Sequence, residues 1–181
     1  MSWELHLTVV GASGALEAFA ASVGARRLEL ELDEDGARHV EEMMTLRVPE
    51  GVDAARAAAE RLARGACERG ITVLRSKVEA PVDTTVPALY LEHHVRVRFS
   101  PPSLAALASI ATRHEAHLSR RPRKQETDHE ERYLTARFGA DEGAREAAAL
   151  EALVRALANA SFEITKVERE RIVLDHHAEA P

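Results

Sequence analysis

The sequence predicts an α+β fold, a tandem duplication of a ferredoxin-like βαββαβ unit, from three repeated features. Residues 4–8 (ELHLT) are echoed by residues 92–96 (EHHVR), each within a segment that alternates apolar and polar side chains. Residues 45–47 (TLR) are echoed in the same way by residues 135–137 (TAR). An alanine-rich segment and then a basic alternating segment follow each of these second motifs. We therefore expect two antiparallel sheets packed around a polar cleft.

The first half of the chain is expected to contain six elements. Strands are indicated by apolar residues at every second position, and helices by capping residues before alanine-rich runs. The expected elements are a strand at Glu4–Val10, a helix from Ser13 to about Val23, strands at Arg27–Asp33 and Met43–Val48, a helix from Asp53 to Gly70, and a strand at Ile71–Glu79. This is the element order of the split βαβ unit.

The second half repeats that order with one longer loop. The expected elements are a strand at Tyr90–Phe99, a helix from Ser103 to about His114, a short strand at His117–Ser119, a strand at Tyr133–Phe138, a helix from about Asp141 to Ala160, and a strand at Phe162–Leu174. In residues 120–131 basic side chains precede acidic ones, which indicates a solvated loop or a lid over a site. The sequence does not assign this loop a role.

The repeats also predict the domain organisation. Residues 1–80 form the first ferredoxin-like repeat, and residues 89–175 form the second. Residues 81–88, which contain Pro81 and Pro87, are the linker. We expect residues 176–181 to form a flexible tail.

The composition excludes several classes of protein. A hydrophobic share of 45% with 30% charged residues is typical of a globular protein in water. The net charge of −6 argues against a dedicated nucleic-acid binder. Cys67 is the only cysteine, so an internal disulfide and a cysteine-based metal site are excluded. With no targeting segment and no apolar run long enough to span a membrane, we expect a cytoplasmic protein without membrane contact.

Alternation along the strands assigns a polar face to each half. The helices of a ferredoxin-like unit cover one side of its sheet, so apolar side chains face them and polar ones face away. On the polar face, the Glu-x-His motifs of Glu4 and His6 and of Glu92 and His94 lie beside the Thr-x-Arg motifs of the third strands. We expect the two faces to form one composite site.

The first interpretation of this site is phosphoester chemistry. His6 and Thr8 form a strand-borne His-x-Thr, in which the imidazole transfers a proton and the hydroxyl holds a phosphoryl oxygen. With its internal duplication, the chain resembles the two-histidine (2H) phosphoesterases, duplicated α+β enzymes with His-x-Thr/Ser in each half. The resemblance implies a small hydrolase of phosphoric esters in which His6, Thr8 and His94 are catalytic and no cofactor is required. The second motif here ends in Arg96 instead of a hydroxyl residue.

The second interpretation is a divalent-metal site. Glu4, His6, Glu92 and His94 would supply two carboxylates and two imidazole nitrogens to one ion between the repeats. Such a mixed ligand set suits Zn, Fe, Mn or Ni, and the residues do not choose among these metals.

The third interpretation is a non-catalytic pocket for an anionic ligand, such as a nucleotide or a polyphosphate. Basic side chains on the polar face would neutralise the ligand, and threonine hydroxyls would donate to its oxygens. The substrate- or anion-binding candidates are Arg47, Arg96, Arg137, Thr45, Thr135, Arg75 and Lys77, with Arg98 and Lys166 as further basic residues. The partner is thus expected to be an anionic small molecule, and the sequence leaves both a monomer and a homodimer open.

Overall fold

The computed structural model of the chain describes residues 3–34, 37–49, 51–81, 83–119, 124–125 and 128–177. By internal contacts the chain divides into two units, residues 1–89 with 171–181 (unit 1) and residues 90–170 (unit 2). The repeat boundaries 1–80 and 89–175 concern a duplication of sequence and stay a prediction. The division by contacts differs from them in assigning residues 171–177 to unit 1.

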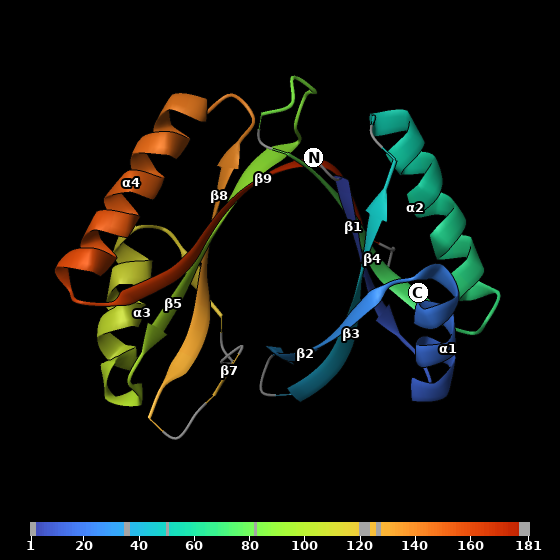
Figure 1. The fold of residues 1–181 in the computed structure, drawn as a ribbon, viewed down its shortest axis with the longest axis horizontal. Coiled ribbons are helices and arrows are strands. Elements are labelled where there is room, and N and C mark those ends of the chain that lie inside the picture. Colours follow the sequence, from blue (N-terminus) through green and yellow to red (C-terminus); the bar gives the residue numbers. More distant parts are fainter. Residues whose placement is uncertain are drawn as a thin grey trace. The chain divides into compact units, whose positions relative to one another are not determined.

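Unit 1 has the strand order of a ferredoxin-like unit. Its elements are β1 (Trp3–Val10), α1 (Ser13–Val23), β2 (Arg26–Glu34), β3 (Ala37–Val48), α2 (Val52–Cys67) and β4 (Thr72–Pro81). The strands are ordered β2-β3-β1-β4, with β1 antiparallel to both of its neighbours. Figure 1 shows α1 and α2 along the same side of these strands. Both helices therefore cover one face and leave the other bare.

Unit 2 has the same order with additional short pieces. Its elements are β5 (Tyr90–Phe99), a 3₁₀ turn (Pro101–Ser103), α3 (Leu104–Arg113), β6 (His117–Leu118), β7 (Lys124–Gln125), β8 (Glu130–Gly139), α4 (Gly143–Asn159) and β9 (Glu163–His177). The order is β9-β5-β8-β6, and β7 also pairs with β8. The helices α3 and α4 lie on one side of the strands (Figure 1).

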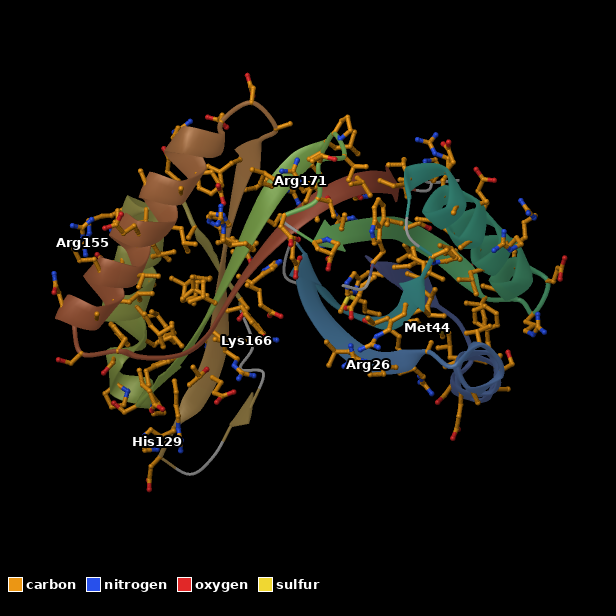
Figure 2. All side chains as sticks on the ribbon, turned by 45° about the horizontal axis from the view of Figure 1, so that its top comes forward. Arg26, Met44, His129, Arg155, Lys166 and Arg171 are labelled. Atoms are coloured by element: carbon orange, nitrogen blue, oxygen red, sulfur yellow. The ribbon has the colours of Figure 1, made fainter. Side chains whose placement is uncertain are left out.

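The strands form one antiparallel sheet, in the order β2-β3-β1-β4-β9-β5-β8-β6, so the prediction of two sheets is wrong. The reason is the length of β9. This 15-residue strand lies between β4 and β5 and is hydrogen-bonded to both of them. The boundary between the units falls inside this strand, just before Arg171, which Figure 2 labels. From there β9 belongs to unit 1, where Leu89 N donates to Ile172 O at 2.7 Å.

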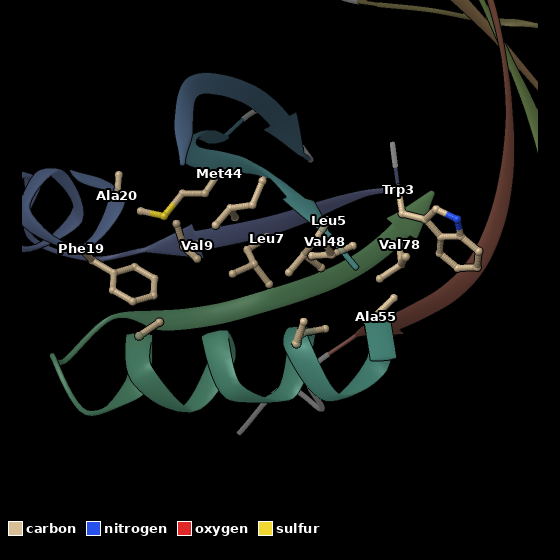
Figure 3. Packing of buried hydrophobic residues seen from close by; sticks show 14 of the residues in the cluster. Trp3, Leu5, Leu7, Val9, Phe19, Ala20, Met44, Val48, Ala55 and Val78 are labelled. Carbon is tan, nitrogen blue, oxygen red and sulfur yellow. The ribbon is translucent and has the colours of Figure 1, made fainter. Parts of the chain in front are cut away.

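The core of unit 1 is formed by one face of its strands and by the helices. Trp3, Leu5, Leu7 and Val9 alternate with half-buried polar residues along β1, and all four are buried. In Figure 3 they lie in a row above α2, whose alanines, such as Ala55, let the helix approach the sheet closely. The same figure shows side chains of β3, such as Met44, of β4, such as Val78, and of α1, such as Phe19, in this layer. With few large aromatic side chains to fill the space between helix and sheet, the core is closed by alanines that let the helix lie near the strands.

The core of unit 2 has the same plan. Its buried residues come from β5, β8, α3, α4 and the residue just before β9, and are Val95, Val97, Phe99, Leu107, Ile110, Ala111, Leu134, Leu153, Leu157 and Phe162. Phe99 and Phe162 meet edge to face, with ring centroids 6.2 Å apart. Each unit thus buries its own apolar cluster against its own pair of helices.

Several element ends differ from the predicted ones; β3, for example, begins at Ala37 and not at Met43, and β8 begins at Glu130 and not at Tyr133. The N-cap of α2 is Gly51, with a φ of 97°, so Asp53 lies in the first turn, where its charge favours the helix dipole. β9 continues through His176 and His177, which were expected in a flexible tail, because this part of the strand pairs within the sheet. Residues 178–181 lie outside the described residues.

Part of the loop expected at 120–131 also lies outside the described residues, at 120–123 and 126–127. The described part contains β7 and the first residues of β8. Among the residues that the structure describes, no helix combines the length and the apolar content needed to span a bilayer.

Replacing Leu7 with Ala is expected to lower the free energy of unfolding by about 2–5 kcal/mol, because it opens a cavity in a packed core. Leu7 has no exposed surface. The matched control is Leu28→Ala, since the side chain of Leu28 is 47% exposed. That variant should stay within about 0.5 kcal/mol of the wild type in urea unfolding. Equal losses for the two variants would contradict the assigned core.

Candidate functional site

In each unit the central strand presents a histidine on the face that the helices leave bare. His6 on β1 is half-buried between buried neighbours, and His94 on β5 alternates in the same way with Val95 and Val97. The strands on either side supply the partners of each histidine, because a central strand has a neighbour on both edges.

In unit 1 three strands build a cluster around His6. The ring atom Nδ1 lies 3.1 Å from Thr45 Oγ1 on β3, and Nε2 lies 2.9 Å from Glu79 Oε2 on β4. The carboxylate of Glu4 joins them, so that one ligand atom from each of Glu4, His6 and Glu79 lies within 4.8 Å of the others. We name these three residues cluster 1. Its second carboxylate, Glu79, also contacts Lys77 Nζ at 2.8 Å.

The contact between His6 and Glu79 is close but not a well-aligned hydrogen bond. His6 Nε2 is a buried atom without a properly directed hydrogen-bond partner, although a carboxylate oxygen lies 2.9 Å away. A lone pair on Nε2 and a carboxylate oxygen would repel each other at this distance.

The pKa of Glu79 reflects this environment. Burial opposes ionisation of its carboxyl group, but His6 and the positive charge of Lys77 outweigh burial and lower the pKa from 4.5 to about 2. Glu79 is therefore a carboxylate throughout the physiological range.

In unit 2 the equivalent strands build a cluster around His94. Its Nδ1 lies 2.9 Å from Thr135 Oγ1 on β8, and its Nε2 lies 3.1 Å from Glu170 Oε2 on β9. Glu92 Oε2 is 3.7 Å from the same Nε2 atom. One ligand atom from each of Glu92, His94 and Glu170 again lies within 4.8 Å of the others. We name these three residues cluster 2.

Glu92 is the most deeply buried member of cluster 2, with 3% of its surface exposed. Arg137 donates to its Oε1 atom at 2.7 Å and stacks over the ring of Tyr90, 4.3 Å from the centroid. The other carboxylate oxygen of Glu92 faces His94. The arginine thus lies on the side of Glu92 away from the imidazole.

The sequence prediction missed Glu79 and Glu170 and gave the threonines a different role. Thr45 and Thr135, expected to bind an anion, contact the Nδ1 atoms of His6 and His94. Each threonine lies opposite its histidine in the pairing of neighbouring strands. Glu79 could have been placed on the polar face from the sequence, because it lies two residues after Lys77 in an alternating strand.

The basic candidates lie beside acidic or hydroxyl groups of their own unit. Arg75 donates to both carboxylate oxygens of Asp175 at 2.7 Å. Arg96 donates to Thr165 Oγ1 at 2.9 Å and lies 3.7 Å from Glu131. Arg47 is exposed and pairs in register with Glu4, and Thr8 is half-buried. Their proposed anion-binding and catalytic roles stay predictions, and the positive charges are largely compensated within the fold.

The opposite face of β5 carries a buried ion-pair network. His93 contacts Glu146 of α4 through Nε2, and Arg169 of β9 donates to Glu146 Oε2 at 2.9 Å. Burial lowers the pKa of His93, against the pull of Glu146. Burial alone would raise the pKa of Glu146, but hydrogen bonds from Arg169 and His93 lower it. This network connects α4 to the sheet. In the sequence it could have been suspected from His93, a histidine that falls on the apolar face of its strand.

The ligand groups that the structure assembles differ from the predicted metal set. Glu4 and His6 are completed by Glu79, and Glu92 and His94 by Glu170, so each motif finds its third ligand in the last strand of the βαββαβ order. A single ion or substrate shared by His6 and His94 stays a prediction, as does the polar cleft between the repeats.

Comparison by sequence matches no protein-family model and no curated protein. The resemblance to two-histidine phosphoesterases therefore stays a prediction. Among solved structures, a "putative glycine cleavage system transcriptional repressor" is 9% identical, with a TM-score of 0.37, covering 94% of this chain and 98% of that one.

Two further structures show a similarly low likeness. The small subunit of acetolactate synthase from Thermotoga maritima is 14% identical, with a TM-score of 0.33, over 100% of this chain and 99% of that one. An unknown protein from Galdieria sulphuraria is 13% identical, with a TM-score of 0.30, over 96% and 100%. These TM-scores are low.

Replacing Glu79 with Gln is expected to reduce the loss of stability in acid. A carboxyl group whose pKa falls from 4.5 to about 2 on folding stabilises the protein above pH 4.5 and loses that contribution as the pH falls towards 2. For the wild type this amounts to about 3 kcal/mol. Urea unfolding at several pH values measures it in both proteins. The control Glu60→Gln, exposed on α2, should keep the wild-type pH profile; parallel profiles for the wild type and Glu79→Gln would refute the assignment.

Proposed function

We propose that the protein binds a divalent transition-metal ion through the glutamate–histidine clusters on the bare face of its sheet. The observation that carries this proposal is the convergence of one imidazole and two carboxylates within 4.8 Å, which is seen among the described residues of each unit. A carboxylate-rich set with one imidazole suits Zn, Fe, Mn or Ni.

The surroundings of each histidine support a ligand role. The Nδ1 atom is held against a threonine hydroxyl, at 3.1 Å for His6 and 2.9 Å for His94. When Nδ1 donates to such a partner, the lone pair of the ring lies on Nε2, which is the atom that faces the carboxylates. Three protein ligands also leave coordination positions for water or a substrate, as in catalytic metal sites.

The recurrence of the cluster also supports a tandem duplication of a ferredoxin-like unit, which we propose as the origin of the chain. Both units have the βαββαβ order, and both place histidine on the first strand, threonine on the third and glutamate on the fourth. Independent origin would have to produce the same two contacts, histidine with threonine and histidine with glutamate, twice.

A second candidate function is the phosphoester chemistry expected from the sequence. It is favoured by the contact of His94 with Glu170, since a carboxylate that orients an imidazole is typical of a general base. The arginines of the same unit, Arg96 and Arg137, would then bind the anionic substrate. We place such a protein in the cytoplasm, with an anionic small molecule or nucleotide as its partner; a homodimer also stays a prediction.

Metal binding is expected to raise the melting temperature of the wild type and to disappear in the double variant His6→Ala/His94→Ala. At a free metal concentration of 100 times Kd, stabilisation is about 2.7 kcal/mol. Calorimetric titration with Zn²⁺ and with Mn²⁺ measures the affinity directly. The control is His176→Ala/His177→Ala, which removes an exposed histidine pair able to bind metal adventitiously. If the control loses binding and the double variant keeps it, the clusters are not the site.

Hydrolysis of cyclic phosphodiesters in the presence of a chelator distinguishes the two candidates. The metal proposal predicts no turnover under that condition, because both imidazoles are committed to their clusters. Turnover that resists the chelator and is lost in both His6→Ala and His94→Ala would favour the second candidate, and would exclude a metal role for these residues in the reaction.

A further inference from the structure

The geometry of cluster 2 depends on the register of β9 against β5. On the bare face, Glu170 of β9 contacts His94 Nε2 of β5 at 3.1 Å. The residues next to these two face the helices and meet Glu146 of α4. His93 contacts Glu146 through Nε2, and Arg169 donates two hydrogen bonds to the same carboxylate, at 3.0 and 2.9 Å. The two strands are therefore held together on both faces, at adjacent residues.

Apolar packing gives this part of β9 little hold. Residues 163–170 all belong to the described part of the chain, and none of them is buried. In unit 1 the corresponding strand β4 buries Val78, which pairs in register with the buried Leu5 of β1. One residue before the histidine and one before the last glutamate of the cluster, unit 2 has His93 and Arg169 instead. The ion network thus takes the place of a hydrophobic pair.

The side chain of Glu146 opposes two kinds of shift of β9. A shift by one residue would turn Arg169 to the bare face and bring a neighbouring glutamate towards Glu146. A shift by two residues keeps every side chain on its own face. In one direction it would bring Glu168 to His94, so the bare face would again supply a carboxylate. On the helix side, however, Val167 would replace the arginine and leave a buried carboxylate without it.

The bare face opposes the remaining shift. In the other direction, a shift by two residues would bring Arg171 to Glu146, so the helix side would again supply an arginine. Ile172 would then replace the carboxylate beside His94. Each face therefore excludes the shift that the other face tolerates, and the register is specified by the two faces together.

We infer, given the metal binding proposed above, that Glu146 is a positioning residue of cluster 2. Through Arg169 it holds β9 in the register in which Glu170, and not Glu168, lies beside His94. A buried ion network adds little net stability compared with apolar residues of the same volume, and specifying a register is its best-attested role. Glu146 thus selects which glutamate of β9 belongs to the site.

The variant Val167→Arg tests this selection at little cost to packing, because Val167 is 43% exposed. After a two-residue shift, arginine at this position would offer Glu146 the partner that valine denies it. NMR cross-peaks between the backbones of β5 and β9 in the metal-free full chain should show one register in the wild type. They should show a second register in Val167→Arg. The matched control Val167→Gln introduces a polar side chain without a charge and should keep one register.

The metal dependence gives a second readout, which a purely structural role would not move. In a His6→Ala background, which disables cluster 1, calorimetric titration with Zn²⁺ measures cluster 2. Glu170→Gln should weaken binding at least about 10-fold, the loss seen even for groups that only support a ligand, whereas Glu168→Gln should leave it near the background value. When Val167→Arg is added, Glu168→Gln should weaken binding as well.

An apolar variant removes the network itself. His93→Leu/Glu146→Met/Arg169→Met replaces it with apolar residues of similar volume and removes one negative and one positive charge together. Urea unfolding should give a stability close to that of the wild type. The variant should nevertheless populate two registers and bind Zn²⁺ through both Glu168 and Glu170. If it does not fold, Val167→Arg decides alone.

The outcomes separate this inference from the proposed function. The wild-type register alone in Val167→Arg, or in a folded apolar variant, would overturn the inference, because another contact would then fix β9. Two registers in the wild type would overturn it as well. A wild type that binds no Zn²⁺ would overturn the proposed function, whereas the NMR comparison needs no metal and tests the register independently.

Discussion

The two-residue alternation along β1 and β5 is the constraint on which the rest of the structure depends. A central strand between two neighbours, with helices on one side only, must bury every second side chain and turn the others to the bare face. Leu5 and Leu7 therefore enter the core, while His6 between them cannot. The neighbouring strands then deliver threonine and glutamate to the same point, because their own alternation is imposed by the same core.

Holding an imidazole at both ring nitrogens has chemical consequences. Thr135 and Glu170 limit the rotation of His94, and Thr45 and Glu79 limit that of His6. A side chain oriented in this way loses little freedom when an ion binds, which is the benefit of preorganisation. The buried network of His93, Glu146 and Arg169 supports it from behind, since His93 and His94 are neighbours on opposite faces of one strand.

The sequence was sufficient for the parts of the fold that depend on local pattern. Alternation identified the faces of β1 and β5, and hence His6 and His94, because successive side chains of a strand point to opposite faces of the sheet. It did not identify Glu79 and Glu170 as partners, since such contacts depend on the register of the strands. Glu79, for example, pairs in register with Glu4 and reaches His6 diagonally. The single sheet was missed for a similar reason. Local pattern can indicate that β9 is a long strand, but it does not indicate which strands, distant in the sequence, β9 will pair with.

The assignment of residues 171–177 to unit 1 has a consequence for synthesis on the ribosome. Unit 1 contains the start of the chain, yet it is completed by Ile172 and Asp175, which are translated after all of unit 2. Until then β4 lacks the strand that covers its outer edge, and Arg75 lacks its carboxylate partner. The half that leaves the ribosome first is thus the half that matures last, and in the interval an open strand edge is available for premature association.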